Sequence, residues 1–329
     1  MTTKLAEVTR GGEVESVHDG TIVVVNVAVD VIAAAGDPEQ FAYFRSSAKP
    51  FQALPVVESG AADRFGFTAA ELALCCASHN GDQGHQDQVA AMLAKLGLDP
   101  SALQCGIPHA YFGDLAITPL QCDCSGKHTG MLAVCLQKGY PIESYLLPTH
   151  PLQIEIRGLV GELCRVDPES LTLATDGCSV PTFGTAIKGF ALAFASLAAP
   201  EAAPGGAHAL ALNRLREAMI AAPANVAGEG DLVTTLMDVG GGQLVAKSGA
   251  EGLICLGVPA KRIGIAIRIA DGSFRAHAAV VTALLRQLDL VDNAIIEAIL
   301  AAHSLELRNH NGIHVGDIRA AFSLNASIT

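Results

Sequence analysis

The sequence lacks an excess of positive charge, a long hydrophobic run and a paired cysteine framework, and each absence excludes a class of protein. Lysine and arginine number 21 against 33 aspartate and glutamate residues, so we expect neither nucleic acid nor an anionic membrane as a partner. No apolar run reaches the length that a membrane-spanning helix needs. The nine cysteines are an odd number, which favours free thiols in a reducing compartment.

The first residues, Met1-Thr2-Thr3-Lys4, lead into polar residues without the apolar core of a secretory signal, so we expect a cytoplasmic protein. Half of the 329 residues are hydrophobic and only 16% are charged, which is typical of a compact globular chain with ample core. We expect residues 1–329 to form a single unit, in which two lobes with a largely helical middle section could be present.

Strand and helix patterns divide the chain into strand-rich ends and a helical middle. The first predicted element is a β-hairpin of Glu13–His18 and Thr21–Val25, with its turn at Asp19-Gly20. The other strand candidates are Val27–Ala35, Leu171–Ala174, Gln243–Ala246, Leu253–Leu256 and Gly264–Ala270. The main predicted helices are Thr68–Cys75, Gln86–Leu96, Leu152–Cys164, Thr185–Leu197, Ala207–Ala221, Arg275–Leu288 and Asn293–Ala302. This layout predicts an α/β or α+β fold, with one antiparallel-rich sheet built from both termini and flanked by helices.

The most informative stretch is Arg45-Ser46-Ser47-Ala48-Lys49-Pro50. The Ser-x-x-Lys spacing of Ser46 and Lys49 places a hydroxyl and an amine one helical turn apart, on the same face. A serine hydroxyl needs an adjacent base to act as a nucleophile, and a lysine held neutral by burial or by a nearby cation can be that base. Pro50 biases Lys49 away from the α region, so we expect the pair at a loop-to-helix junction. The motif by itself is short enough to arise by chance.

Two further segments extend this pattern to three motifs in a defined order. Ser78-His79-Asn80 is a Ser-x-Asn on a predicted loop, and Lys247-Ser248-Gly249 directly follows a strand candidate. The order Ser-x-x-Lys, Ser-x-Asn, Lys-Ser-Gly is typical of serine β-lactamases and penicillin-binding proteins, and it indicates serine acyl transfer. The alternative is that Ser78 caps a turn and Lys247 is a solvated charge at a strand end.

A separate group of residues is a candidate metal site. Cys124 and Lys127 lie three residues apart, and Cys178 comes from a second segment; two thiols from different segments could share a soft metal such as zinc. Lysine is an uncommon ligand because its nitrogen must lose a proton to bind, and free cysteines are most often small buried residues. Spacing alone therefore favours buried cysteines over a metal site.

Six segments together resemble the Rhizobium-type (class 3) L-asparaginases. They are Arg-Ser-Ser-Ala-Lys-Pro-Phe-Gln at 45–52, Cys-Ala-Ser-His-Asn-Gly-Asp at 76–82, Cys-Ser-Gly-Lys-His at 124–128, Thr-Asp-Gly-Cys at 175–178, Lys-Ser-Gly-Ala-Glu-Gly at 247–252 and Ile-Ala-Asp-Gly at 269–272. The resemblance covers nearly the whole chain, without a departure at these positions. It implies a serine β-lactamase-like fold, a homodimer, and hydrolysis of L-asparagine to aspartate and ammonia.

The resemblance implies two Ser–Lys pairs, Ser46 with Lys49 and Ser78 with Lys247. On this basis we expect Ser46 to attack the side-chain amide, Lys49 to take its proton, and Ser78 with Lys247 to relay protons. Water then resolves the β-aspartyl ester. Both lysines must be neutral for part of the cycle, so we expect both pKa values to be depressed by burial and mutual repulsion.

The resemblance also implies a zinc ion held by Cys124, Lys127 and Cys178, which reverses the preference from spacing alone. We expect this zinc to position the substrate rather than to activate water, because the Ser–Lys pairs already supply a nucleophile; Cys124 and Lys127 are then also substrate-binding residues. Asparagine carries an α-ammonium and an α-carboxylate, so the pocket needs both signs of charge. Asp176 and Arg45 are the candidate partners for these groups.

Two other classes of protein remain as alternatives. One is a β-lactamase or peptidase that uses the same Ser–Lys chemistry, and the other is a non-enzymatic protein that binds a metal or an amino acid. The sequence leaves open the preference for asparagine or glutamine, which serine attacks first, whether zinc is essential, and which surface would form the dimer.

Overall fold

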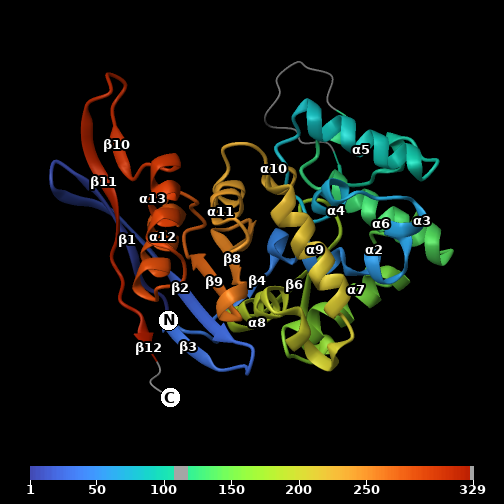
Figure 1. The fold of residues 1–329 in the computed structure, drawn as a ribbon, viewed down its shortest axis with the longest axis horizontal. Coiled ribbons are helices and arrows are strands. Elements are labelled where there is room, and N and C mark those ends of the chain that lie inside the picture. The colour runs from blue at the N-terminus through green and yellow to red at the C-terminus, as the bar shows by residue number, and fades with distance from the viewer. Residues whose placement is uncertain (107–117, 327–329) are drawn as a thin grey trace.

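The structure is a computed structural model that describes residues 1–106 and 118–326, and a large antiparallel sheet forms one part of it (Figure 1). The order of the main sheet is β10-β11-β1-β2-β9-β8-β7, and β3 pairs with both β2 and β12. A smaller sheet has the order β4-β6-β5. The strands are β1 Thr3–Arg10, β2 Glu13–Asn26, β3 Val31–Ala35, β4 Phe41–Tyr43, β5 Thr172–Thr175, β6 Pro181–Ala186, β7 Val245–Gly249, β8 Leu253–Val258, β9 Ile263–Ile269, β10 Glu306–Arg308, β11 His314–Ala320 and β12 Asn325–Ala326.

Both ends of the chain contribute to the main sheet, as the sequence predicts. β1 pairs antiparallel with β2 on one side and with β11 on the other, so that Ala6 lies opposite His18 and Ala320. The predicted antiparallel-rich sheet built from both termini is therefore confirmed. The β10–β11 hairpin at its outer edge was not predicted (Figure 1).

The predicted hairpin with a turn at Asp19-Gly20 is wrong, because both residues lie inside the continuous strand β2. The hairpin turn is instead Gly11-Gly12, between β1 and β2, where both glycines have positive φ values, 58° and 95°. Gly20 is required for a different reason: a Cβ there would lie 2.2 Å from the backbone oxygen of Arg268 on the neighbouring strand β9. Close approach of two strands, rather than a turn, explains this glycine.

Helices flank the main sheet and form the rest of the molecule. Helix α8 packs against β2, β8 and β9, while α12 packs against β1 and β11. The helices labelled α2 to α7 and α9 gather on the side away from the β10–β11 hairpin (Figure 1). The helices are α1 Lys49–Gln52, α2 Leu54–Glu58, α3 Ala61–Arg64, α4 Ala69–Cys75, α5 Gln83–Lys95, α6 Ser125–Lys138, α7 Pro151–Leu163, α8 Ile187–Ala198, α9 Ala209–Ala221, α10 Pro223–Ala227, α11 Leu232–Gly240, α12 His277–Gln287 and α13 Asn293–Ala302.

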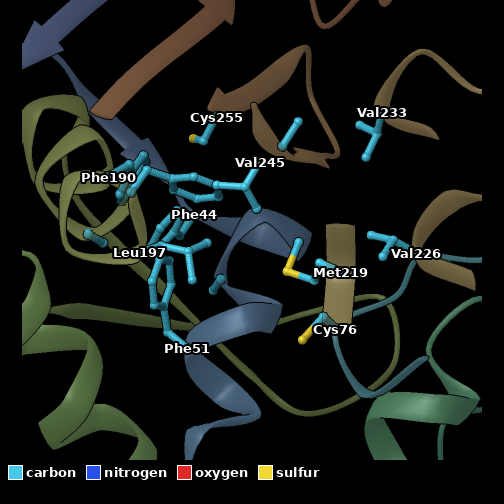
Figure 2. Close-up of a cluster of buried hydrophobic side chains, with 14 of the residues drawn as sticks. Phe44, Phe51, Cys76, Phe190, Leu197, Met219, Val226, Val233, Val245 and Cys255 are labelled. Atoms are coloured by element: carbon cyan, nitrogen blue, oxygen red, sulfur yellow. The ribbon is translucent and has the colours of Figure 1, made fainter. Parts of the chain in front are cut away.

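A continuous hydrophobic core joins the sheet to the helices. Figure 2 shows part of it, where Phe44 lies between Phe51 of α1 and Phe190 of α8. The rings of Phe44 and Phe190 stack with their centroids 4.2 Å apart. In residues 1–106 and 118–326, every helix is too short or too polar to span a bilayer.

Candidate active site

The segment Ser46–Lys49 lies where a 3-10 turn, Arg45–Ala48, passes into α1. The expectation that Pro50 keeps Lys49 out of the α region is wrong, because Lys49 has α-helical angles and begins α1. Phe44 and Phe51, on either side of the segment, are fully buried and hold it against the core. Each buried ring contributes about 1.5–3 kcal/mol relative to an exposed one. Arg45 has a φ of +48°, a left-handed conformation that costs a non-glycine residue about 1–3 kcal/mol. Strained backbone therefore directly precedes Ser46.

Ser78 lies between the two lysines. The ammonium group of Lys49 donates a hydrogen bond to Ser78 Oγ at 2.8 Å, and Lys247 Nζ lies 2.9 Å from the same oxygen. Both lysines are fully buried. Ser46 is half-buried, and within the described part of the chain no hydrogen bond joins it to Lys49. The structure thus brings Lys49, Ser78 and Lys247 into one chain of contacts. Ser46 is not part of this chain, but it lies only three residues before Lys49.

Strand β7 places Lys247. The predicted strand candidate ended at residue 246, but β7 extends to Gly249, so that Lys247 is a residue of the strand and not a solvated charge at its end. The hydroxyl of Ser47 donates to the backbone oxygen of Lys247 at 3.0 Å and ties β7 to the Ser46–Lys49 segment. A Cβ at Gly249 would lie 3.1 Å from Ser47 Oγ, so a glycine is what lets the two segments approach.

The two lysines have opposite pKa shifts. Burial, together with the positive charge of Lys49, lowers the pKa of Lys247 from 10.5 to about 7. Burial also acts to lower the pKa of Lys49, but the negative charges of Cys124 and Asp123 outweigh it and raise that pKa. The expectation that both pKa values fall is therefore right for Lys247 and wrong for Lys49. At neutral pH, Ser78 lies between a charged amine and one that is close to half neutral.

The three predicted metal ligands lie together in the interior. Lys127, on the first turn of α6, donates to Cys178 Sγ at 2.9 Å, and Cys124 shares hydrogen bonds with Cys178 and Cys122. These hydrogen bonds, together with the nearby lysine charges, hold the pKa of Cys124 well below its usual range. Burial acts to lower the pKa of Lys127, but the charges of Cys178 and Cys124 reverse the shift and raise it. These shifts favour a thiolate at Cys124 and an ammonium at Lys127.

A second set of potential ligands shares Cys124 with the first. The thiols of Cys122 and Cys124 and a carboxylate oxygen of Asp123 all lie within 4.8 Å of one another, a spacing that could hold a metal ion. Thiolates, carboxylates and a deprotonated amine are all ligands that zinc accepts. Cys124, Lys127 and Cys178 also offer donor atoms suited to zinc, two sulfurs and one nitrogen, and all three residues are buried, with Lys127 Nζ 2.9 Å from Cys178 Sγ.

Arg45 and Asp176, the predicted partners of the substrate charges, bind each other. Arg45 Nε donates to Asp176 Oδ1 at 2.7 Å. The carboxylate belongs to a tight turn in which the N–H of Ser179 donates to the carbonyl of Asp176, and this turn also carries Cys178. The ion pair therefore connects the residue before Ser46 with the loop that supplies one of the thiols.

Asp123 is a site residue that the sequence did not single out. Its Oδ2 lies 3.4 Å from Lys49 Nζ and 3.5 Å from Cys124 Sγ, so Asp123 lies between the lysine–serine chain and the thiol group. Its backbone oxygen accepts the N–H of His79 at 3.2 Å, which fixes it to the loop of Ser78. A possible signal was its place in the run Cys122-Asp123-Cys124, between two potential metal ligands.

Comparison with known proteins gives structural matches and a family match. A crystal structure of a β-lactamase from Mycobacterium bovis is similar with a probability of 1.00, a TM-score of 0.39 and 15% sequence identity, over 87% of this chain and 95% of that chain. No curated protein matches the chain.

Residues 6–320 match the family model described as L-asparaginase II. The chain is therefore an amidohydrolase, an enzyme class to which the buried lysines around Ser78 are well suited. Within that class it belongs to the L-asparaginase II family, as its resemblance to the Rhizobium-type enzymes indicated.

Proposed function

We propose that this protein is an L-asparaginase, which hydrolyses the side-chain amide of L-asparagine to L-aspartate and ammonia through an acyl-enzyme. Family membership supports the reaction. The observation that carries the mechanism is the chain from Lys49 through Ser78 to Lys247, with contacts of 2.8 and 2.9 Å. A hydroxyl between a charged amine and one that is about half neutral can accept a proton from the first and give a proton to the second.

In this mechanism Ser46 is the nucleophile. Lys49 first gives a proton to Ser78, which passes its own proton to the neutral form of Lys247. Lys49 is then neutral and takes the proton of Ser46 as the Ser46 oxygen attacks the amide carbon. Lys49 therefore stays charged overall, which agrees with its raised pKa, and Lys247 is the final acceptor, which agrees with its pKa of about 7. A side-chain turn of Ser46 towards Lys49 completes the path, because the described residues show no hydrogen bond between them.

The first half-reaction then closes when the proton returns along the same path. The C–N bond of the tetrahedral adduct breaks, the nitrogen takes the proton, and ammonia leaves while Ser46 carries a β-aspartyl ester. Water attacks this ester, gives one proton back to Ser46 through the lysine chain, and releases aspartate. Backbone N–H groups beside Ser46 stabilise the oxyanion in both steps.

Arg45 is the proposed partner of the substrate α-carboxylate. Only its Nε is engaged by Asp176, so its terminal nitrogens can form a two-pronged contact with a carboxylate. Asp176 fixes the direction of the guanidinium group and neutralises part of its charge. A substrate held in this way lies directly beside Ser46 because Arg45 precedes it in the chain.

Cys124, Lys127 and Cys178 are the residues that would hold zinc. When bound, the metal supplies a fixed positive charge that attracts and orients an oxygen of the substrate. Cys124 presents its sulfur as a thiolate, Cys178 is within hydrogen-bonding distance of it, and Lys127 gives up a proton to bind. Their burial keeps the group rigid, and Cys124 and Lys127 would thereby take part in substrate binding.

We further propose that residues 1–329 act as one catalytic unit, that the unit forms a homodimer, and that it works in the cytoplasm. Family resemblance supports the dimer, and the free thiols, all nine of which are unpaired in the described residues, support a reducing compartment. Light scattering of the purified protein measures the dimer directly.

Trapping of the acyl-enzyme tests the mechanism. Wild-type protein mixed with L-asparagine and quenched in acid should carry one aspartyl group, which peptide mass mapping should place on Ser46. Ser46→Ala should retain its fold and lose both the label and ammonia release, whereas Ser47→Ala, which removes only a hydrogen bond to the backbone of β7, should still carry the label on Ser46. A label on Ser78 would assign the attack to that residue. Parallel assays with L-glutamine, D-asparagine and a chromogenic β-lactam define the substrate class.

A further inference from the structure

The charge distribution of the site leaves the substrate α-ammonium without its predicted partner. Asp176 lies 2.7 Å from Arg45 Nε, and its side chain is only 10% exposed. Its negative charge is already balanced inside the protein, and a substrate ammonium would have to compete with a guanidinium for it. Some other carboxylate must receive the ammonium if the site is to bind an amino acid.

Asp123 is a carboxylate in the required place. Its side chain is 55% exposed, and its Oδ2 lies 3.4 Å from Nζ of the buried Lys49. Among the residues that the structure describes, no other carboxylate contacts Lys49, Ser78 or Lys247. In asparagine, one methylene separates the carbon that carries the α-ammonium from the amide carbon. The group that binds the ammonium must therefore lie close to the reacting amide, as Asp123 does.

The contacts that Asp123 already makes leave its charge available. A strong hydrogen bond between an ammonium and a carboxylate is about 2.7–2.9 Å long, and the 3.4 Å contact with Lys49 is looser than this. The thiol of Cys122 lies 3.9 Å from the carboxylate and is a weak donor, and Cys124 Sγ lies at 3.5 Å but as a thiolate has no proton to donate. The backbone of Asp123 is nevertheless fixed, because its carbonyl accepts the N–H of His79.

We infer, on the basis of the proposed asparagine hydrolysis, that Asp123 binds the α-ammonium of the substrate and thereby selects amino-acid amides over amides that lack this group. Arg45 then binds the α-carboxylate of the substrate, and Asp123 binds its α-ammonium. Without Asp123, the ammonium would enter a site that contains the positively charged Lys49, and repulsion would disfavour binding.

A pair of substrates that differ only in the ammonium tests this assignment. L-Asparagine and succinamate carry the same amide and the same terminal carboxylate, but succinamate has a hydrogen in place of the α-ammonium. Asp123→Asn should lower kcat/KM for L-asparagine by roughly 10- to 100-fold, the range of one charged hydrogen bond, mainly through a higher KM. The same substitution should lower kcat/KM for succinamate by a factor roughly tenfold smaller than for L-asparagine, because a substrate without the ammonium is affected only through the contact of Asp123 with Lys49. Asp87→Asn, which changes an exposed carboxylate on α5, is the matched control and should change neither value.

The outcomes separate binding from an indirect effect on catalysis. Equal losses with both substrates would overturn the inference, because they would mean that Asp123 acts only through the contact with Lys49. An unchanged KM for L-asparagine would overturn it as well.

Calorimetric binding of L-aspartate and succinate to the same proteins gives the comparison without turnover. The inference requires that Asp123→Asn weaken L-aspartate roughly 10- to 100-fold and not succinate. If wild-type protein binds L-aspartate but releases no ammonia from L-asparagine, the proposed reaction fails while the assignment of Asp123 is still decided by these binding constants.

Discussion

Replacement of Lys247 by methionine should stabilise the folded protein while it abolishes amide hydrolysis. Lys247 is fully buried, and its pKa is lowered from 10.5 to about 7, chiefly by burial. Methionine has a similar volume and no charge, so it can occupy the same space without a cost of desolvation. The same substitution removes the final proton acceptor of the proposed mechanism.

The size of the effect follows from the two pKa values. At pH 7 the unfolded chain holds a full proton on Lys247, while the folded protein holds it about half of the time. At 1.36 kcal/mol per pKa unit, this difference destabilises the wild-type fold by about 4 kcal/mol at pH 7. Methionine loses the contacts of Nζ with Ser78 and with the carbonyl of Ser248, at about 1 kcal/mol each. The expected net gain for Lys247→Met is therefore about 2 kcal/mol at pH 7.

The gain should depend on pH in a defined direction. Because the folded pKa lies below the unfolded one, the destabilisation is complete below pH 7 and disappears above pH 10.5. Between these values, wild-type stability rises with pH relative to the variant. By pH 9 the destabilisation has fallen to about 2 kcal/mol, which the lost hydrogen bonds cancel, so the two proteins should then be about equally stable.

Urea unfolding at pH 7 and pH 9 measures both quantities. Lys188→Met, which removes an exposed partner of Glu39, is the control and should change the free energy of unfolding by at most about 1 kcal/mol at either pH. A Lys247→Met protein that is less stable than wild type at pH 7 would refute the reasoning. A stability difference that is the same at both pH values would refute it too.

Further expectations concern rate, metal and packing. The kcat/KM of wild-type protein for L-asparagine should rise from acidic pH to a plateau, with its midpoint near pH 7, as Lys247 becomes neutral; a flat pH–rate profile contradicts a lysine base. Cys124→Ala and Cys178→Ala should lose zinc, measured by elemental analysis, and raise KM more than they lower kcat; unchanged zinc content in both excludes this site. Gly249→Ala should destabilise by about 1–3 kcal/mol in urea and slow turnover, since its new Cβ would meet Ser47 at 3.1 Å; an unaltered enzyme would show that β7 can shift freely.

Local patterns in the sequence predict most helices and the mixed, antiparallel fold, but not the long-range pairing of strands. The capping box of Thr68 and Glu71 and the apolar spacing after it locate α4 without any knowledge of the tertiary structure. The Asp19-Gly20 pair led to a wrong prediction because the sequence does not distinguish a glycine that accommodates a neighbouring strand from a glycine that makes a turn. Only the position of β9, far along the chain, distinguishes the two.

In the candidate site, too, the sequence predicts the residues of local motifs but not the contacts between distant segments. Motif order and family resemblance were enough to single out Ser46, Lys49, Ser78 and Lys247, and the structure places three of them in one chain of contacts. The role of Asp123 could not be predicted, because it depends on the distance of its carboxylate from a lysine 74 positions earlier in the chain. The exposure of the Asp123 side chain and the ion pair of Asp176 with Arg45 are likewise properties of the folded molecule.

The different charges of the two lysines follow from their neighbours, and they explain why a site of this kind needs both. A single buried lysine has to be neutral to accept a proton and charged to attract the developing negative charge, and it cannot be both at once. Here the carboxylate of Asp123 and the thiolate of Cys124 keep Lys49 charged, while Lys247 has no carboxylate in contact within the described residues and loses its proton near pH 7. Ser78 connects the two amines, so a proton received at one can be stored at the other. In the proposed mechanism, the acidic and thiol groups around Lys49 therefore determine which of the two lysines is charged.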